Sequence, residues 1–495
     1  MYDLFKRAYV SLTCPLSVCP STLPPTTTAP APIHSLPPEL ILQIGFWLIY
    51  YDPAPDTHLS HLLAADSATP THPLEDLVAA TQVCRWWRAL LTATPPLWSV
   101  VHLAEDLPLS RTRLGLAHAA AAPLDVVVRS WDPADVALLR TVQDRVRTLQ
   151  LSFFLCYNSE LGAFRFPALT SLAMESACTP KLDRDAFPAL RMLNIDGASF
   201  QVTGQLPLEQ VEVLVVRGAV RGAFLAERLG DVGSTLRELV LEGLTEAPGE
   251  PLVMSALTKL HLGGTADVVA GFLRDMEAPA LRELCVVVEE QTAAKSNASK
   301  HAKTVASNHG PSSAPSNSSN SPIDFVECLA AFGANSPYIV AATLPALPLP
   351  AYGSVYGAYG SIRRLVLHVH HGARQTLVGL TQAGVFQRLE YLHLVGVGGD
   401  ASLSNDSVRD VKKDSLYASQ HSREASNRSL DMDAVVDLAE ARYGSTPLAR
   451  VDACGVVGAD ACGIVGAGDG PRVQALQDRV HALRQAGLRL EFLQE

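Results

Sequence analysis

A short apolar frame recurs along the chain and strongly limits the folds open to it. The frame has aliphatic residues in the arrangement L-x-x-L-x-L. It begins at Leu169, Leu190, Val211, Leu236, Leu257, Leu281, Ile362 and Leu389. The first six starts are separated by 21, 21, 25, 21 and 24 residues, and the last two lie 27 residues apart. Alternating apolar residues fit a strand with one buried face. A recurrence of this kind therefore predicts one strand per repeat, with the repeats stacked side by side.

Pieces with helical periodicity lie between these frames, such as AFLAERLGDV from Ala223 and DVVAGFLRDM from Asp267. One strand with one helix cannot bury its own apolar face, so neighbouring repeats must share a continuous core. The frame and its period resemble those of leucine-rich repeats. The resemblance implies an α/β fold class, with an irregular leucine-rich-repeat solenoid that has parallel strands on its concave face and helices on its convex face.

One departure from the repeat pattern predicts irregularity. The position that usually carries Asn or Cys in such repeats holds other residues here: Ala177, Ala198, Ala219, Leu244 and Thr265. Without those side chains, the turn carbonyls lack a stacked row of donors. At the end of the chain, a helix from Met432 and a helix and strand from Pro471 are interpreted as a terminal cap.

The composition along the chain predicts its division into parts. Residues 1–32 are rich in Pro and Thr and are expected to form a disordered tail, with a secretory signal as the alternative. Residues 33–104 are expected to form a small all-α module with a variable insert at about 51–73. Residues 105–495 are expected to form the repeat array, interrupted by disordered polar loops at about 291–322 and 401–429.

Two stretches of the N-terminal module carry a family resemblance. LPPELILQI from Leu36 has apolar residues at helical spacing, and VCRWWRALLTATPPLW from Val83 follows after the insert. Together they resemble the F-box as it occurs in a large fungal family, and APLDVVVRS from Ala122 resembles the segment that follows the F-box there.

The resemblance implies a three-helix module that binds the Skp-family adaptor of SCF-type (Skp, cullin, F-box) ubiquitin ligases. The residues at the matching positions, expected to bind the adaptor, are Leu36, Pro37, Pro38, Leu40, Ile44, Val83, Cys84, Trp87, Arg88 and Leu90. The alternative is that these apolar residues form the core of a helical cap on the repeat array. Trp98 is interpreted as a core residue at the junction to the first repeat.

A substrate surface is expected on the strand face that alternates with the buried leucines. The residues placed there are Glu175, Asn194, Asp196, Arg217, Glu238, Glu242, Lys259, His261, Arg364, His368, Tyr391 and His393. Their mixed charge indicates a protein ligand of mixed polarity. For each residue taken singly, an ordinary solvated position on a strand is the alternative.

Other functions are excluded by what the sequence lacks. The net charge of −11 and the absence of clustered Lys and Arg argue against nucleic acid, and no run of about 18 apolar residues predicts a membrane span. Nine scattered cysteines fit reduced thiols in the cytoplasm, the nucleus or both. The His368, His370 and His371 run lacks further metal ligands, and the Gly-rich stretch 455–470 lacks the phosphate-loop ending.

These observations lead to one main hypothesis and two alternatives. The chain is expected to be a substrate-recognition adaptor of an SCF-type ubiquitin ligase, with no cofactor and no catalysis of its own. Its partners would be the Skp-family adaptor with its cullin ligase and an unidentified protein substrate. The first alternative is a leucine-rich-repeat scaffold that binds proteins without a ligase. The second is a hydrolase hidden in the irregular C-terminal part.

Overall fold

The computed structural model describes most of the chain between Leu36 and Leu493. The described residues are 36–50, 73–104, 108–129, 132–151, 163–174, 184–202, 206–230, 232–288, 322–345, 355, 358–369, 380, 386, 388–396, 430–443, 448–454, 456–457 and 470–493. The contacts divide the chain into two compact units, Met1–Leu97 and Trp98–Glu495. No helix in the described part of the chain is long and apolar enough to cross a membrane.

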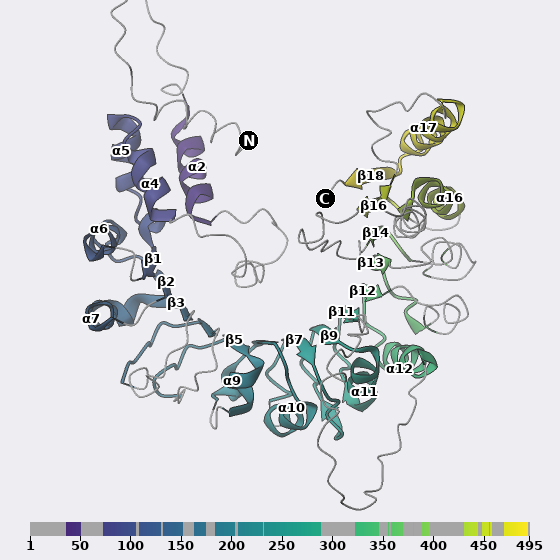
Figure 1. Cartoon of the computed structure of the whole chain (residues 1–495), viewed down its shortest axis with the longest axis horizontal. Coiled ribbons are helices and arrows are strands. Elements are labelled where there is room, and N and C mark those ends of the chain that lie inside the picture. The colour runs from purple at the N-terminus through teal and green to yellow at the C-terminus, as the bar shows by residue number, and fades with distance from the viewer. Residues whose placement is uncertain are drawn as a thin grey trace, which may run out of the picture. The chain divides into compact units, whose positions relative to one another are not determined.

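The first unit is helical (Figure 1). It contains α2 (Pro38–Tyr50), α4 (Pro73–Thr81), α5 (Arg85–Thr92) and the start of the 3-10 helix η3 (Pro95–Trp98). Pro38 opens α2, where its fixed φ suits the first turn and its missing N–H costs nothing. The expected tail and most of the expected insert, residues 51–72, lie outside the described residues.

The three helices of the first unit pack closely around a small core. Ile41, Leu77 and Leu91 are fully buried. Gly45 lies at the crossing of α2 and α5, because a Cβ there would come within 3.0 Å of Leu91 Cδ2. Arg88 Nε donates a hydrogen bond to the carbonyl of Thr81 at 3.1 Å, which joins the end of α4 to α5. The unit therefore has an apolar core of its own.

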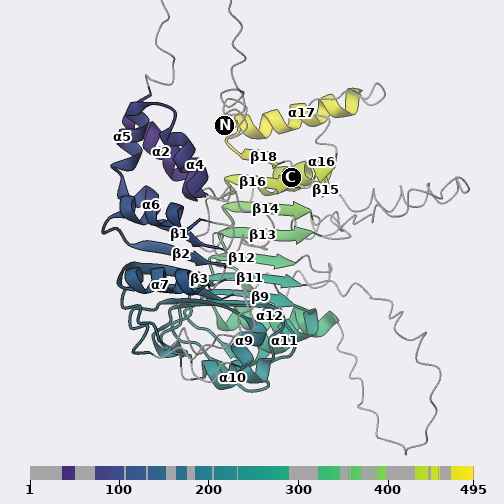
Figure 2. The same cartoon turned by 60° about the vertical axis from the view of Figure 1, so that its left-hand side comes forward.

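Among its described residues, the second unit is built on one sheet of fourteen parallel strands, whose spatial order follows their order in the chain. The strands are β1 (Val100–Leu103), β2 (Leu124–Val128), β3 (Val146–Leu151), β4 (Ser171–Met174), β5 (Met192–Asp196), β6 (Val213–Arg217), β7 (Glu238–Leu244), β9 (Lys259–Gly264), β11 (Glu283–Val288), β12 (Ala341–Pro345), β13 (Arg364–Val369), β14 (Tyr391–Gly396), β16 (Arg450–Cys454) and β18 (Arg489–Leu493). Figure 2 shows several of them as neighbouring arrows that point the same way. The expectation of an α/β fold with parallel strands is confirmed.

Helices and short turns connect these strands, and the helices lie along one side of the row of strands (Figure 1). They are α6 (Leu109–Ala119), α7 (Pro133–Val142), α9 (Gly197–Val202), α10 (Gly222–Leu229), α11 (Ala266–Asp275), α12 (Pro322–Asn335), α16 (Met432–Tyr443) and α17 (Gly470–Gln485), with the 3-10 helices η4 (Gln143–Arg145) and η5 (Leu208–Gln210). Two small parallel ladders pair β8 (Leu252–Val253) with β10 (Met276–Glu277), and β15 (Leu430–Asp431) with β17 (Val456–Val457). We call the sheet face toward the helices the helix face, and the other one the opposite face.

The leucines of the recurring frame fill the helix face. In the copy that begins at Leu236, all three aliphatic residues are buried, including Leu239 and Leu241. The register places Leu239 beside Leu214 on one neighbouring strand and beside Leu260 on the other. Equivalent leucines therefore meet across each strand pair, and they form the continuous core that the spacing predicts.

The frame also extends to the first strand of the sheet. Trp98 is buried and occupies the first apolar position of the frame before β1, two residues before Val100. This confirms Trp98 as a core residue. It also places β1 in the sheet, so the second unit begins at Trp98, whereas the sequence predicts the boundary after residue 104.

The strand register is irregular at two points. The register shifts between β2 and β3 at Leu124, and between β7 and β9 after Leu241. At the second shift, Gly243 has a φ of +80°, and a Cβ on it would lie 2.8 Å from the carbonyl oxygen of Gly218. The expected loops 291–322 and 401–429 lie outside the described residues, except that Pro322 begins α12.

Candidate functional site

Helix α2 in the first unit has a buried side and an exposed apolar side. Ile41 is fully buried, whereas 44% of Leu40 and 47% of Trp47 are exposed to solvent, and Ile44 is half-buried. Spacings of four and three residues place Leu40, Ile44 and Trp47 on one face of the helix. Phe46 is a further exposed aromatic residue on α2. The helix thus presents large apolar side chains that remain partly exposed to solvent.

Helix α5 also has a buried side and an exposed side, and its two adjacent tryptophans lie on different sides. Trp87 is fully buried, together with Leu91 one turn later, whereas 40% of Trp86 is exposed. Leu90, four residues after Trp86, is half-buried and shares its face of the helix. Val83, just before α5, is also exposed. The helical phase therefore assigns one tryptophan to the core and the other to the surface.

The residues expected to bind an adaptor take several places in this unit. Pro37, Pro38, Leu40, Val83 and Arg88 are exposed, and Leu36, Ile44, Cys84 and Leu90 are half-buried. Trp87 differs from the expectation, because its complete burial makes it a core residue.

The half-buried Cys84 has a structural contact, since its Sγ accepts a hydrogen bond from the backbone N–H of Trp87 at 3.4 Å and so caps α5. Trp86, Trp47 and Phe46 are the exposed aromatics that the motif alone does not identify. Trp87 lies four residues before the buried Leu91 and so shares its face of the helix, whereas Trp86 lies off that face.

In the second unit, the opposite face of the sheet carries rows of side chains in register. The first residues of neighbouring strands pair with one another, so that one row crosses the sheet at right angles to the strands. From β7 onward this row contains Glu238, Lys259, Glu283, Ala341, Arg364, Tyr391, Arg450 and Arg489. The row divides into a section of mixed charge on β7, β9 and β11, and a basic section from β13 to β18.

The mixed section is paired within itself. Lys259 Nζ lies 3.2 Å from Glu283 Oε2, and burial raises the pKa of Glu238 while the positive charge of Lys259 opposes that shift. His261 lies two residues after Lys259, and burial lowers its pKa against the opposing effect of Glu242. Neutral His261 is therefore the favoured form near pH 7.

Cys285 is the register partner of His261 on β11. Burial raises the pKa of the Cys285 thiol to about 11, although a hydrogen bond with Thr343 acts in the other direction. A thiol with this pKa is almost entirely protonated at neutral pH and makes a poor nucleophile. The adjacent cysteine and histidine therefore do not form an activated pair.

Of the other predicted substrate residues, Asn194 differs from the expected exposed position, and Asp196 and Arg217 have structural contacts. Asn194 is buried, and the carboxylate of Asp196 accepts a hydrogen bond from the backbone N–H of Ala198 at 3.0 Å, in the first turn of α9. Arg217 Nε lies 3.7 Å from Glu242 Oε2. Glu175 lies outside the described residues.

The basic section is centred on an aromatic ring. Tyr391 on β14 is flanked by Arg364 on β13 and Arg450 on β16, whose Cζ atoms lie 5.8 and 5.5 Å from the centre of its ring. Arg489 on β18 is the register partner of Arg450. Arg364 and Arg489 are exposed, and Tyr391 and Arg450 are half-buried.

Two histidines belong to the same strands. His393 follows Tyr391 by two residues, with ring centres 6.4 Å apart, and the half-buried His368 lies near the end of β13. The structure thus brings together Arg364, Tyr391 and His393 from the predicted substrate surface, and it adds Arg450 and Arg489.

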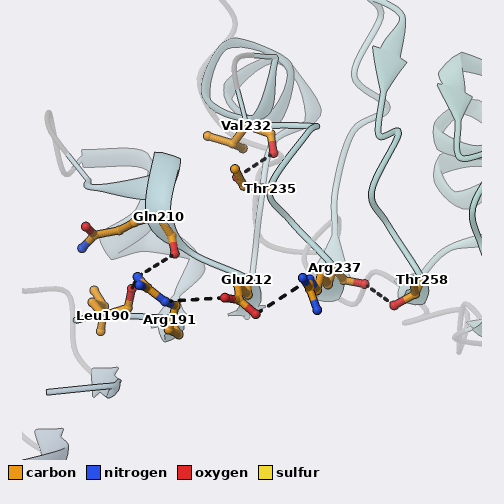
Figure 3. Close-up of polar contacts among 8 residues, drawn as sticks. All are labelled: Leu190, Arg191, Gln210, Glu212, Val232, Thr235, Arg237 and Thr258. Atoms are coloured by element: carbon orange, nitrogen blue, oxygen red, sulfur yellow. Dashed lines mark hydrogen bonds and ion pairs between the residues drawn. The ribbon is translucent and has the colours of Figure 1, made fainter. Parts of the chain in front are cut away.

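The edge of the sheet at the strand N-termini also carries charged side chains, and some of them form ion pairs with one another. Figure 3 shows Glu212 between two arginines, with its carboxylate oxygens 3.5 Å from Arg191 Nε and 3.8 Å from Arg237 Nε. The hydroxyl of Thr258, just before β9, donates a hydrogen bond at 3.0 Å to the carbonyl of Arg237, just before β7. These contacts join neighbouring strands across the stack.

Among the side chains that the structure describes, no group of His, Cys, Asp and Glu is arranged to hold a metal ion. Comparison with protein-family models gave no match to this chain. Comparison with curated proteins gave no sequence match either.

Proposed function

We propose that this chain is a substrate-recognition adaptor of an SCF-type ubiquitin ligase that acts in the cytoplasm, the nucleus or both. In this proposal the first unit is an F-box module that binds a Skp-family adaptor. The second unit is a leucine-rich-repeat solenoid that holds a protein substrate on the opposite face of its sheet. The chain adds no chemistry of its own, and it positions the substrate near the recruited enzymes.

The exposed apolar side chains of the first unit carry the proposal. Five of the nine exposed large hydrophobic side chains among the described residues lie in this unit: Leu40, Phe46, Trp47, Val83 and Trp86. The same unit buries Ile41, Leu77, Trp87 and Leu91, so it has a core without them. Exposed tryptophans beside a formed core are typical of a protein-binding surface, and aromatic residues are enriched among those that dominate binding.

The sheet supports the second half of the proposal. Fourteen parallel strands in chain order are expected of a stack in which each repeat contacts only its neighbours. Such stacks present long surfaces that suit extended protein segments. The charged rows of the opposite face give this surface its selectivity, because their side chains are not needed for the leucine core.

Co-expression with a Skp-family adaptor tests the docking half of the proposal. We expect Leu40→Asp to weaken adaptor binding at least about tenfold, since a carboxylate at an apolar contact loses its solvation. Leu114→Asp on α6 is the matched control, because 44% of each leucine is exposed to solvent. Unchanged binding of the folded Leu40→Asp protein would contradict the proposal.

The alternative function, a repeat scaffold that works without a ligase, predicts a different outcome. In that case the helices serve as a cap, and the intact chain does not bind the adaptor. Removal of the residues before Trp98, which leaves the second unit complete, would then destabilise the sheet. Hydrogen exchange in β1 and β2 of the shortened chain measures this effect and separates the two functions.

A further inference from the structure

One turn at the edge of the sheet formed by the strand N-termini carries two exposed apolar side chains. Tyr338 and Val340 flank the buried Ile339 just before β12, and 66% of Tyr338 and 40% of Val340 are exposed to solvent. They are two of the four exposed large hydrophobic side chains among the described residues of the second unit. The other two, Leu114 and Val253, lie apart on α6 and β8.

The repeat does not require apolar side chains at these two positions. In the eight full copies of the frame, the position equivalent to Val340 is always polar or charged: Thr170, Arg191, Glu212, Arg237, Thr258, Arg282, Arg363 and Glu390. The position equivalent to Tyr338 carries alanine, a polar residue or a charged one: Ala168, Ala189, Gln210, Thr235, Ala256, Ala280, Ser361 and Arg388. Single exposed apolar residues are common on protein surfaces, but an aromatic and an aliphatic residue together at an otherwise polar edge indicate a contact with another molecule.

Arginines lie on both sides of this pair along the edge. The N–H of Val340 donates a hydrogen bond to the carbonyl of Arg282 at 2.9 Å, and the N–H of Arg363 donates to the carbonyl of Val340 at 2.9 Å. Val340 therefore lies between Arg282 and Arg363, and both are exposed. The exposed Arg388, before β14, occupies the position equivalent to Tyr338 two strands further along. We call Arg282, Tyr338, Val340, Arg363 and Arg388 the edge patch.

The edge patch keeps positive charge when its ion pairs are taken into account. Arg363 Nη1 lies 3.4 Å from Glu390 Oε1, and both side chains are exposed. Glu283, the next residue after Arg282, forms an ion pair with a lysine of β9 at 3.2 Å. Arg282 and Arg388 form no ion pair with any residue that the structure describes. The patch therefore combines an exposed apolar centre with an excess of arginine, and both are typical of residues that dominate protein binding.

We propose that the edge patch binds an extended segment of a partner protein, in which a large apolar residue has an acidic residue two positions before it and another two positions after it. The segment runs along the edge, across the strands. Its apolar side chain contacts Tyr338 and Val340, and its carboxylates contact the guanidinium groups on either side.

The spacing of such a segment fits the edge patch. Alternate residues of an extended chain point the same way and are about 6.6 Å apart, so all three side chains face the patch. Arg282, Val340 and Arg363 precede neighbouring strands, which lie about 4.8 Å apart. The difference of about 2 Å on each side is within the reach of a long, flexible arginine side chain.

The composition of the patch favours a protein segment over nucleic acid. Val340 is aliphatic and offers no aromatic face on which a base could stack. Glu390 places a negative charge beside Arg363, which disfavours a continuous phosphate backbone. The inference goes beyond the proposed function, because that function uses neither this edge of the sheet nor an acidic segment.

Fluorescence anisotropy of synthetic peptides with the full-length chain tests the inference. The first probe carries Glu-Ser-Leu-Ser-Glu within an unstructured Gly and Ser sequence. Three companion peptides replace the glutamates by glutamine, replace the leucine by serine, or move the glutamates to the positions directly beside the leucine. A single-stranded RNA oligomer is the fourth companion. We expect the first probe to bind more tightly than each companion, and less tightly as ionic strength rises.

The repeats themselves supply variants that keep the fold. Tyr338→Ala and Val340→Thr introduce the residues that stand at the equivalent positions as Ala280 and Thr258. We expect Tyr338→Ala to weaken binding about tenfold or more, and Val340→Thr about threefold, since both remove apolar contact area. Arg282→Gln should weaken binding about three- to fivefold, as loss of an exposed ion pair would.

Val253→Thr on β8 is the matched control for Val340→Thr, because Val253 is also an exposed valine but lies outside the edge patch. It should leave peptide binding unchanged. Absence of binding to the first probe would overturn the inference, and so would equal binding by the wild type and the Tyr338→Ala variant. Equal weakening by Val253→Thr, or tighter binding of RNA than of the peptide, would overturn it as well. Hydrogen exchange of β11 and β12 confirms that each variant is folded.

This inference and the ligase proposal fail separately. If Tyr338→Ala and Arg282→Gln bind the first probe as the wild type does, the edge patch is refuted while adaptor binding stands. If Leu40→Asp leaves adaptor binding unchanged, the ligase proposal is refuted while peptide binding at the edge patch stands.

Discussion

The adjacent tryptophans of α5 offer a sharp test of how the first unit is built. Trp87 is fully buried, whereas 40% of Trp86 remains exposed. We therefore expect Trp87→Ala to unfold the first unit locally and Trp86→Ala to leave it folded. The two substitutions remove the same side chain from neighbouring positions of one helix, so helix propensity and composition are matched.

The magnitudes follow from the burial. A buried tryptophan removes about 150–250 Å² from water, and at about 25 cal/mol per Å² this is worth about 4–6 kcal/mol. Measured truncations of core tryptophans to alanine cost about 3–5 kcal/mol. Because two fifths of Trp86 stays in water, we expect its truncation to cost about 2 kcal/mol or less.

Hydrogen exchange of α5 in the full-length chain measures this difference, since global unfolding of a chain with two units is not a two-state process. Trp87→Ala should speed exchange by about two to nearly four orders of magnitude, and Trp86→Ala by less than about thirtyfold. Trp87→Phe should fall well below Trp87→Ala, because it keeps an aromatic ring in the core. Equal exchange in the two alanine variants would refute the assignment of core and surface.

Three further predictions concern the second unit. Gly222→Ala should destabilise the sheet by about 2 kcal/mol or more in a denaturant titration, because a Cβ there would lie 2.1 Å from the carbonyl carbon of Ala247. Gly263→Ala is the control and should be nearly neutral, since the nearest atom to a Cβ there would be the Cα of Glu242 at 3.5 Å. Cys285, with a pKa of about 11, has roughly 1 thiolate in 1,000 at pH 8 and should resist alkylation until the protein unfolds, as mass spectrometry of labelled peptides will show. Burial raises the pKa of Tyr359 above its ordinary value of 10.0, so the folded state binds this proton more tightly and stability should fall as pH rises above about 10. Tyr359→Phe should lessen that fall in unfolding curves.

The sheet could be predicted from the sequence where leucine fills the frame, and not where smaller residues replace it. The copies at Ile339 and Leu448 have alanine at a core position, Ala342 and Ala453, and the last copy begins with Gly487. These strands, β12, β16 and β18, lack the full apolar frame that alternation detects. In the folded chain their position in the sheet is set by pairing with the strands beside them.

The candidate surfaces were predictable to a smaller extent. In the first unit, the motif led us to expect Trp87 among the adaptor-binding residues, with a core position as the alternative, and Trp87 is buried. A motif records which residues recur and not which way each one faces. Helical phase relative to Leu91 resolves this point. On the sheet, Arg364 and Tyr391 followed from alternation within their frames. Arg450 was missed together with its strand, and Arg489 was missed although its strand was expected as part of the terminal cap.

The separation of core rows from surface rows explains how one architecture could serve as a docking and recognition device. Each strand buries its leucines on the helix face, and its alternate residues lie on the opposite face at a fixed spacing of about 4.8 Å per strand. A substitution on the opposite face, such as Arg364→Gln, therefore alters the surface without removing a leucine. The first unit likewise has a core around Trp87 that is separate from its exposed Trp47 and Trp86. Loss of substrate binding in a variant of the opposite face that keeps adaptor binding would therefore assign recognition to the sheet and docking to the helices.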